Sequence, residues 1–326
     1  MKTCFKYLLV LILIPLQAVA QYPPAAGLEG STAVKNDSSI ITGWAVGCEV
    51  IRGYIDISNP DLGMVSFGDP ADATGFAEGN SAGVVSLGDG GSALLTFDIP
   101  VADGDGWDFA VFENAMNDTF LELAFVEVSS DGEIFFGFPA ISLTDTSQQV
   151  PAFGGIDCTK INNLAGKYRQ GYGTPFDLSE LAGTPGLDLQ RITHIRITDV
   201  VGSISEEFAG FDSMGRAVND PWPTAFETGG FDLDGIAVIN TAGAGVEEIR
   251  ADVLIYPNPC MDMLTIATDF AGRLSCDLVD QSGNRIYSEA FYHHLKINMD
   301  NHAAGLYCII LTSEDAQSVF SVISIR

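Results

Sequence analysis

Short strand-like runs separated by turn residues are the feature that most limits what this chain can fold into. In WDFAVFEN, residues 107–114, alternation puts Phe109 and Val111 on one face and Ala110 and Phe112 on the other, as in a β-strand. Other runs of this kind occupy residues 83–87, 93–99, 121–126, 133–138, 192–200 and 231–240. The chain therefore has the makings of many short strands.

The turns between these runs indicate how the strands connect. Gly88-Asp89-Gly90-Gly91 separates the first two runs, and Asp131-Gly132 predicts a hairpin. Only residues 177–181 look helical, and that stretch is short. Many short strands with glycine-rich turns favour two packed antiparallel sheets. We therefore predict an all-β fold whose main body is a β-sandwich or jelly roll.

Composition shifts divide the chain into two domains. We predict a large domain over residues 22–240, a linker over 241–250, and a compact C-terminal domain over 251–326. The linker sequence, TAGAGVEEIR, offers few side chains to bury.

The first twenty residues have the order of a secretory signal peptide. Lys2 and Lys6 precede an apolar run over residues 7–16, and Ala18-Val19-Ala20 predicts cleavage before Gln21. The apolar run is too short for a membrane anchor, and no later segment has the length or composition of a span. We therefore expect an exported chain with no transmembrane segment.

Acidic residues dominate the charge. The net charge is -28, which argues against nucleic acid or an anionic membrane surface as a partner. Between Arg52 and Lys160 the chain has many carboxylates and no Lys, Arg or His. These carboxylates must be solvated, paired with distant cations, or bound to metal ions.

Five cysteines follow the signal peptide: Cys48, Cys158, Cys260, Cys276 and Cys308. Export permits disulfides, and Cys48 with Cys158 is one candidate pair, although an odd total leaves at least one thiol over. No CxxC or CxxH spacing is present, which argues against structural zinc.

The C-terminal domain carries a set of ordered landmarks. IYPNPC begins at Ile255, LVDQSGNRIY at Leu278 and AAGLYCIIL at Ala303. In this order they resemble the C-terminal sorting domain of the type IX secretion system of Bacteroidota. The resemblance implies a small β-sandwich that addresses its cargo to the outer-membrane machinery. It also implies a secreted or surface protein, with the sorting domain commonly removed and the cargo released or attached to lipopolysaccharide.

The large domain has a looser resemblance. GDGGSALLTFD, FLELAFVEVSSDG and GGFDLDGIAVIN are similar to segments of an uncharacterised family of bacterial secreted or cell-surface proteins. The SSDG hairpin and the FDLDGIAV strand also resemble galactose-binding-like jelly rolls, which include carbohydrate-binding modules with a structural calcium. This second resemblance concerns the fold alone.

The acidic turn DGDGWD, residues 103–108, is a candidate calcium site. It is not an EF-hand, because loop positions 5, 6 and 12 are Trp107, Asp108 and Asn114. Calcium also accepts looser oxygen sets, and a late strand of a jelly roll often lies near an early one. We therefore predict these metal ligands: Asp103, Asp105, Asp108, Asp232 and Asp234. The alternative is a plain turn with polar edge residues.

Catalytic signals are weak. The chain has no GxSxG, no HExxH and no phosphate-binding glycine loop, and His194 is predicted to be a surface residue of a strand. A polysaccharide hydrolase needs only two nearby carboxylates, and Glu113, Glu122 and Glu127 make that alternative possible.

Ligand binding has better support. A basic and aromatic cluster in an otherwise acidic domain lies in a glycine-rich loop at residues 164–178, LAGKYRQGYGTPFDL. A second loop, NDPWPTAF, adds Trp222. Aromatic faces with a few polar or cationic groups suit a carbohydrate or another small ligand. The predicted ligand contacts are Lys167, Tyr168, Arg169, Tyr172 and Trp222. The alternative is that these aromatics only pack the loops onto the sandwich. We predict a non-enzymatic binding or structural surface module.

Overall fold

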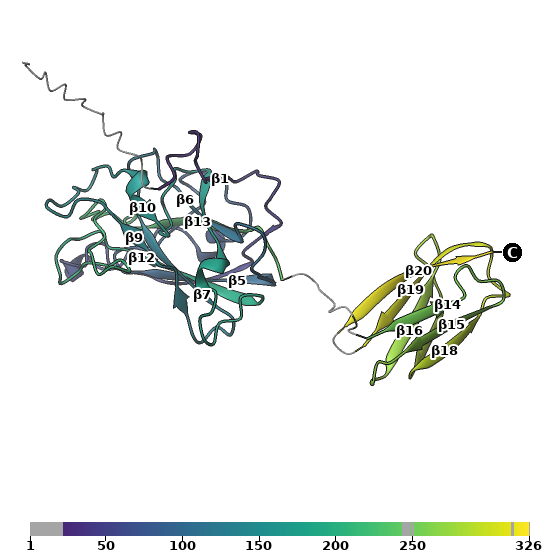
Figure 1. The fold of residues 1–326 in the computed structure, drawn as a ribbon. Coiled ribbons are helices and arrows are strands. Elements are labelled where there is room, and N and C mark those ends of the chain that lie inside the picture. The colour runs from purple at the N-terminus through teal and green to yellow at the C-terminus, as the bar shows by residue number, and fades with distance from the viewer. Residues whose placement is uncertain (1–21, 243–248, 250, 314–315, 326) are drawn as a thin grey trace, which may run out of the picture. The chain divides into compact units, whose positions relative to one another are not determined.

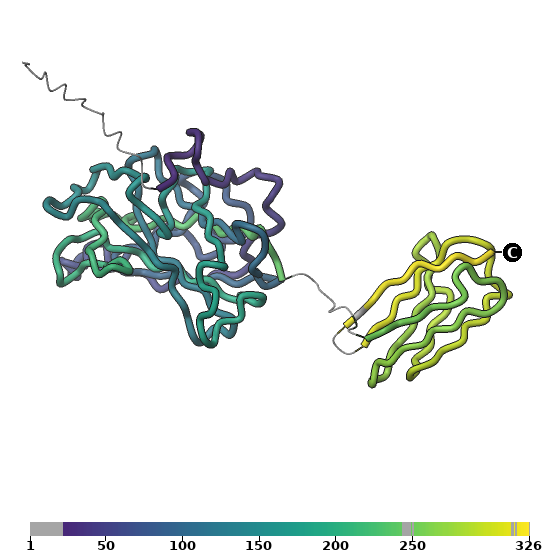
Figure 2. The backbone as a smooth tube through the Cα atoms, in the orientation of Figure 1, coloured from purple at the N-terminus to yellow at the C-terminus, as the bar shows by residue number. Residues whose placement is uncertain are grey.

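The computed structural model describes residues 22–242, 249, 251–313 and 316–325. The chain divides into one unit ending at Ala242 and a second beginning at Gly243 (Figures 1 and 2). The predicted signal peptide and most of the predicted linker lie outside the described residues. Within the described part of the chain, none of the helices has the length and apolar composition that a membrane span requires.

The first unit is built from antiparallel sheets, as the alternating runs predicted. A six-stranded sheet has the order β1-β11-β6-β13-β2, with β4 also pairing β13, and a five-stranded sheet has the order β3-β5-β12-β7-β8 (Figure 1). The strands of the first sheet are β1 (Val34–Lys35), β2 (Gly43–Trp44), β4 (Val85–Ser86), β6 (Phe109–Glu113), β11 (Tyr172–Phe176) and β13 (Asp232–Val238). Those of the second are β3 (Gly47–Ile51), β5 (Ser92–Val101), β7 (Ala124–Ser129), β8 (Phe136–Gly137) and β12 (Ile192–Asp199).

Smaller elements complete this unit. Strands β9 (Ile141–Ser142) and β10 (Ile161–Asn162) form a separate pair. The helical elements described here are single turns of 3₁₀ helix: η1 (Pro60–Leu62), η2 (Pro70–Ala73), η3 (Cys158–Lys160) and η4 (Leu178–Leu181). The last of these lies where a short helix was predicted.

The main core lies between the two large sheets. Leu95 and Ile197 of one sheet share a buried cluster with Phe109, Phe176 and Ile236 of the other. A second cluster, which includes Ala110 and Phe112, covers the opposite face of β6. The predicted alternation in β6 is therefore confirmed. Both faces are nevertheless buried, which explains why no residue of β6 is polar except its last, Glu113.

The predicted hairpin at Asp131-Gly132 is also confirmed, because β7 and β8 pair on either side of it. Ser129 Oγ and Asp131 Oδ1 accept hydrogen bonds from backbone N–H groups of this turn. Such local acceptors fix the turn where the alternation breaks.

The candidate disulfide between Cys48 and Cys158 is wrong. Each of the five cysteines is a free thiol in the described structure. Cys48 lies on β3 against the main core, whereas Cys158 is buried in η3 within a different cluster. Export made a disulfide chemically available, but the two thiols belong to different parts of the sandwich.

The second unit is a smaller sandwich with its own core. A three-stranded sheet, β14-β15-β18, faces a four-stranded sheet, β17-β16-β19-β20, across a shared cluster of buried side chains. The strands are β14 (Val253–Tyr256), β15 (Met263–Thr268), β16 (Leu274–Val279), β17 (Arg285–Phe291), β18 (His294–Asn298), β19 (Gly305–Thr312) and β20 (Gln317–Ser324).

The sequence landmarks of this unit have structural tasks. Asn258 accepts a hydrogen bond from the Ile323 backbone N–H and donates one to the Ser321 carbonyl, so it ties the Pro-rich entry to β20. Asp280 accepts from the backbone of the β16–β17 turn, where Gly283 has a φ of 80° that suits glycine. Tyr307 is buried, and its hydroxyl donates to the Ala303 carbonyl.

Candidate functional site

The strongest candidate site is a pocket at the end of the large sandwich where β6 finishes and β13 begins. Its volume is about 240 Å³. The carboxyl and amide groups of its lining come from the β6–β7 loop and the first residue of β13: Asn114, Glu122 and Asp232. The apolar part comes from loops that converge on this end of the sandwich: Phe67, Met116, Phe120, Phe153 and Phe226.

Glu122 is the unusual member of the pocket. Only 9% of the residue is exposed, yet its carboxyl forms no hydrogen bond and no ion pair with any described residue. Asp232 is 6% exposed, but Ser86 Oγ and Asn114 Nδ2 both donate to its carboxylate. The oxygens of Glu122 are not among the enclosed side-chain atoms without a partner, so they open into the pocket, where a ligand can supply the partner that the described chain does not.

A third acid lies beneath the pocket. Glu113, the last residue of β6, is 1% exposed, and its Oε2 accepts from the Ala115 N–H. Its Oε1 is buried without a hydrogen-bond partner among the described residues. Because it is closed off from solvent, Glu113 cannot contact a bound ligand directly, which corrects its place in the predicted carboxylate pair.

Burial raises the pKa of all three acids. The pKa values of Glu113 and Glu122 lie well above the ordinary glutamate range, first because of burial and then because of neighbouring carboxylates. The pKa of Asp232 rises to about 6, again through burial, and its hydrogen bonds with Ser86 and Asn114 limit the rise. Clusters of perturbed acids in a pocket are typical of functional sites.

Aromatic side chains form the rim. Phe120 and Phe153 have ring centroids 6.4 Å apart, and Phe153 and Phe226 5.7 Å apart. Phe153 is 75% exposed, so most of its ring is open to solvent. An exposed aromatic row beside buried carboxyls gives the pocket one apolar wall and one acidic floor.

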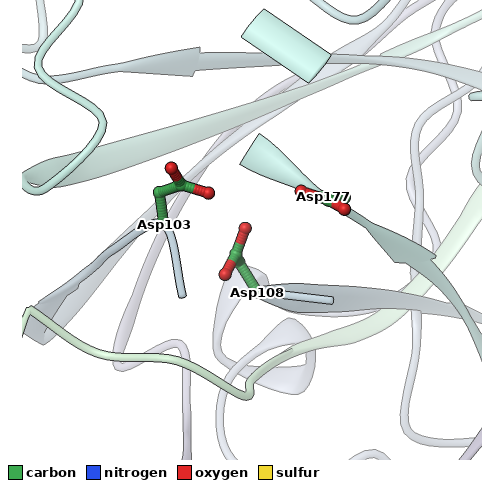
Figure 3. Close-up of side chains that lie close together, drawn as sticks. All are labelled: Asp103, Asp108 and Asp177. Carbon is green, nitrogen blue, oxygen red and sulfur yellow. The ribbon is translucent and has the colours of Figure 1, made fainter. Parts of the chain in front are cut away.

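The acidic turn at the other end of β6 gathers a different set of carboxylates. Oxygens of Asp103, Asp108 and Asp177 lie within 4.8 Å of one another, and Figure 3 shows them around one space. Asp108 is fully buried, and its carboxylate accepts from the Gly104 N–H, the Leu178 N–H and Asn240 Nδ2. Oδ1 of Asp103 has no partner among the described residues.

The predicted metal set is therefore wrong in its membership. Strand β13 runs antiparallel to β6, with Val238 opposite Phe109 and Leu233 opposite Glu113. This register puts Asp232 and Asp234 toward the far end of the strand from Asp108. Asp232 belongs to the pocket, and Asp234 accepts from the backbone N–H groups of Glu78 and Gly79.

The remaining predicted ligand, Asp105, is exposed and lies outside the three-carboxylate group. Asp177, which directly follows β11, takes the place beside Asp103 and Asp108 that was predicted for Asp232 and Asp234. The pairing of β11 with β6 brings it there, and no spacing rule within the turn could have shown that.

Two of the predicted ligand contacts are buried, which contradicts that role. Lys167 is 4% exposed, and its Nζ donates to the Ile161 carbonyl. Tyr168 is 1% exposed, and its hydroxyl is 2.9 Å from Thr32 Oγ1. Burial lowers the pKa of Lys167 to about 8. The alternative prediction, that these side chains pack the loop onto the sandwich, describes both residues.

The other three predicted contacts are held by neighbours. Arg169 pairs with Asp118 at 2.6 Å and lies 4.8 Å from the Tyr172 ring. Trp222 donates from Nε1 to Asp89 and packs against Phe208. None of the five residues lines the pocket. The loop that carries Trp222 does contribute to it, through Thr224 and Phe226.

The sequence pointed to several residues of this pocket, but with different predicted roles. Glu122 was a possible catalytic acid, Asp232 a metal ligand, and residues 219–226 a binding loop. Phe120 and Phe153 were missed, because each is an isolated aromatic in a loop without periodicity. Only the converging loops bring them together.

Comparison with known proteins establishes the class of the chain. The two sandwiches and the ordered landmarks of the second define an exported all-β protein with a C-terminal sorting domain. Residues 254–325 match the model of the family described as the secretion system C-terminal sorting domain. The protein is therefore a type IX secretion cargo that is secreted or displayed on the outer surface.

Other comparisons say little about the large domain. A β-glucuronidase from Ruminococcus gnavus in complex with D-glucuronic acid has 12% identity and a TM-score of 0.24, covering 94% of this chain and 47% of its own. The BSP domain of a biofilm associated protein has 9% identity and a TM-score of 0.22, covering 89% and 53%. The chain thus spans about half the length of these structures. Such low scores carry no argument, and no curated protein matches.

Proposed function

We propose that the large domain is a ligand-binding module, delivered to the cell exterior by its sorting domain, whose pocket takes a small carbohydrate or another small ligand. The observation that carries this proposal is Glu122, a buried carboxyl without a partner in an aromatic-rimmed pocket. Packing alone gives no reason to keep an unpaired acid there, because a buried glutamate without partners destabilises the fold.

The shape of the pocket limits the ligand. At about 240 Å³ it is smaller than the range of about 300–1,000 Å³ typical of drug-sized ligands. It suits one ring or one short branch, with the rest of a larger ligand outside. Phe153 offers an exposed ring face, and Asn114 and Glu122 offer polar groups at depth.

A screen of glycans and small metabolites against the full chain tests this function. Phe153→Ala should weaken binding of any hit about fivefold or more, because stacking on one aromatic ring contributes about 1 kcal/mol or more. Phe211→Ala, which removes another exposed phenylalanine that does not line this pocket, is the matched control. A hit that is insensitive to Phe153→Ala would place binding elsewhere and contradict the proposal.

Polysaccharide hydrolysis is the second candidate, and the pairing of Glu122 with Asp232 in one pocket favours it. A glycosidase uses one protonated carboxyl and one carboxylate. The raised pKa of Glu122 suits the first of these roles. Release of reducing sugar that disappears in Glu122→Gln would support hydrolysis over simple binding. Binding without any release in the wild type would exclude it for that ligand.

Delivery by the sorting domain has a direct test. Removal of residues 251–326 should leave the large domain in the periplasm, because the sorting domain is the part that addresses cargo to the outer-membrane machinery. Cell fractionation measures this. Normal surface delivery of the shortened chain would contradict the assignment.

A further inference from the structure

The charge inside the pocket is one-sided. Two carboxyls, from Glu122 and Asp232, line it, and no lysine or arginine of the described chain does. Arg52 is the nearest cation that influences Asp232, but its guanidinium donates to the backbone carbonyls of Phe67, Gly68 and Ser86. No described side chain therefore supplies a counter-charge to Glu122.

The aromatic rim indicates which kind of positively charged ligand could pair with Glu122. Aromatic faces carry negative potential and attract cations, best of all those with methyl or methylene groups around the charge. The Phe120–Phe153–Phe226 row stands beside the acidic floor, so a single ligand group can contact both. A negatively charged ligand adds a further anion beside these carboxyls, and a neutral one can donate a hydrogen bond to Glu122 but brings no counter-charge.

A bare metal ion fits less well. Among the described residues, the group of three carboxylates with oxygens close enough to share one ion is at Asp103, Asp108 and Asp177, at the other end of β6. Glu113, Glu122 and Asp232 do not form such a group. The pocket thus has two lining carboxyls and a row of aromatic rings, a set that suits an organic cation better than a bare metal ion.

We propose that the pocket binds an organic ammonium ligand, with the charged nitrogen between Glu122 and Asp232 and its apolar groups against Phe153 and its aromatic neighbours. This inference rests on the proposed ligand-binding function and names the chemical class of the ligand. An amino sugar or a quaternary amine has the required chemistry.

Proton linkage follows from the same geometry. Burial raises the pKa of Glu122, and the negative charges of Glu113, Asp232, Asp220 and Asp199 raise it further. A cation in the pocket favours the ionised carboxyl, so binding expels a proton. Affinity for a ligand of fixed charge should therefore increase as the pH rises toward the pKa of Glu122.

Choline and its neutral isostere, 3,3-dimethyl-1-butanol, test the charge alone. Calorimetry on the full chain should show choline binding at least tenfold more tightly than the isostere. The heat should differ between phosphate and Tris at one pH, because the buffer takes up the released proton. Glu122→Gln should reduce choline affinity about tenfold and leave the isostere unchanged, whereas Glu49→Gln on exposed strand β3 should alter neither.

Other outcomes overturn the inference in distinguishable ways. Equal affinity for the two probes would remove the ammonium requirement and leave the ligand-binding function standing. Binding of neither probe would also overturn it, and the glycan and metabolite screen would then judge the broader function. Choline binding that survives Glu122→Gln unchanged would place the cation outside this pocket. Phe153→Ala should weaken both probes, and it checks the location independently of charge.

Discussion

The two ends of strand β6 carry acidic groups of opposite character. Before the strand, Asp108 is buried and takes three N–H donors from its own chain. After the strand, Glu122 is buried and takes none, while Glu113 keeps one oxygen unpaired. A five-residue extended strand separates its two ends by about 15 Å. Acidic density alone therefore says little about function; what distinguishes the ends is whether the fold itself satisfies the carboxyl.

The difference has an energetic meaning. A carboxylate bonded to backbone N–H groups stabilises the loops that supply them, and its removal leaves those donors unsatisfied. A carboxyl without donors only adds a burial cost. The first end should thus be sensitive to mutation through stability, and the second through ligand binding.

The largest effect is expected from Asp108→Ala. It leaves the Gly104 and Leu178 N–H groups and the Asn240 amide without their acceptor, so stability should fall by about 3 kcal/mol or more. All three tryptophans, Trp44, Trp107 and Trp222, lie in the large domain, so fluorescence during urea unfolding follows that domain alone.

Asp105→Ala is the control for this substitution. Asp105 is exposed in the same turn, and its loss should change stability by less than about 0.5 kcal/mol. Equal stability of the two variants would show that the hydrogen bonds of Asp108 contribute no more to the fold than the exposed side chain of Asp105.

The next effect is on pH dependence. Burial raises the pKa of Asp89 to about 6 and of Asp199 to about 7. An acid with a raised folded pKa holds its proton more tightly when folded, so its contribution is full below its unfolded pKa and falls as pH rises to the folded value. Large-domain stability should thus fall by about 1–3 kcal/mol between pH 5 and pH 8.

Asp89→Asn isolates one part of this slope. The amide oxygen can still accept from the Ile57 N–H and Trp222 Nε1, while the titrating charge is gone. The decline above pH 5 should become shallower. Asp131→Asn should leave it unchanged, because Asp131 is exposed and its pKa is lowered by turn hydrogen bonds. A steeper decline in Asp89→Asn would contradict this account.

Calcium should have a smaller effect, and it sharpens the comparison at the first end. The structural calcium predicted from sequence stays a prediction, now with Asp103, Asp108 and Asp177 as its carboxylate ligands. Binding would raise stability by about 1.4 kcal/mol at a free calcium concentration of ~10 times Kd. The midpoint should return with chelator, and Asp177→Asn should reduce the shift. An unchanged midpoint would remove calcium from this end of β6.

The smallest effect on stability is expected from Glu122→Gln. The carboxyl has no hydrogen bond to lose. The free energy of unfolding in urea should therefore lie within about 0.5 kcal/mol of the wild-type value, or slightly above it. A loss of several kcal/mol would show that Glu122 supports the fold, and the two ends of β6 would no longer differ in kind.

Local sequence pattern was sufficient for the strands and insufficient for the sites. The period-2 alternation of β6 and the turn at Asp131-Gly132 are set by neighbours in the chain, so both were predictable. The proximity of Asp177 to Asp108 was not predictable, because it depends on the pairing of β11 with β6. Strand β13 does lie beside β6, as expected, but its antiparallel direction puts Asp232 at the opposite end of β6 from Asp108.

Burial was the second quantity that the sequence could not supply. Lys167, Tyr168 and their neighbours read as a basic aromatic loop, and such a loop can face solvent or pack inward with the same residues. The structure turns Lys167 and Tyr168 inward. Phe153 lies in a loop without a periodic pattern and is exposed.

Strand β20 in the sorting domain has a consequence for the life of the chain. It pairs along all of β19, and it also exchanges backbone hydrogen bonds with Cys260 through Ile323 and Ile325. The opening of the sorting domain is thus held by residues that are synthesised well after it, on the far side of five intervening strands. A nascent chain that has not yet reached β20 lacks the hydrogen-bond partner of Cys260, so this opening stays incomplete until β20 has been added.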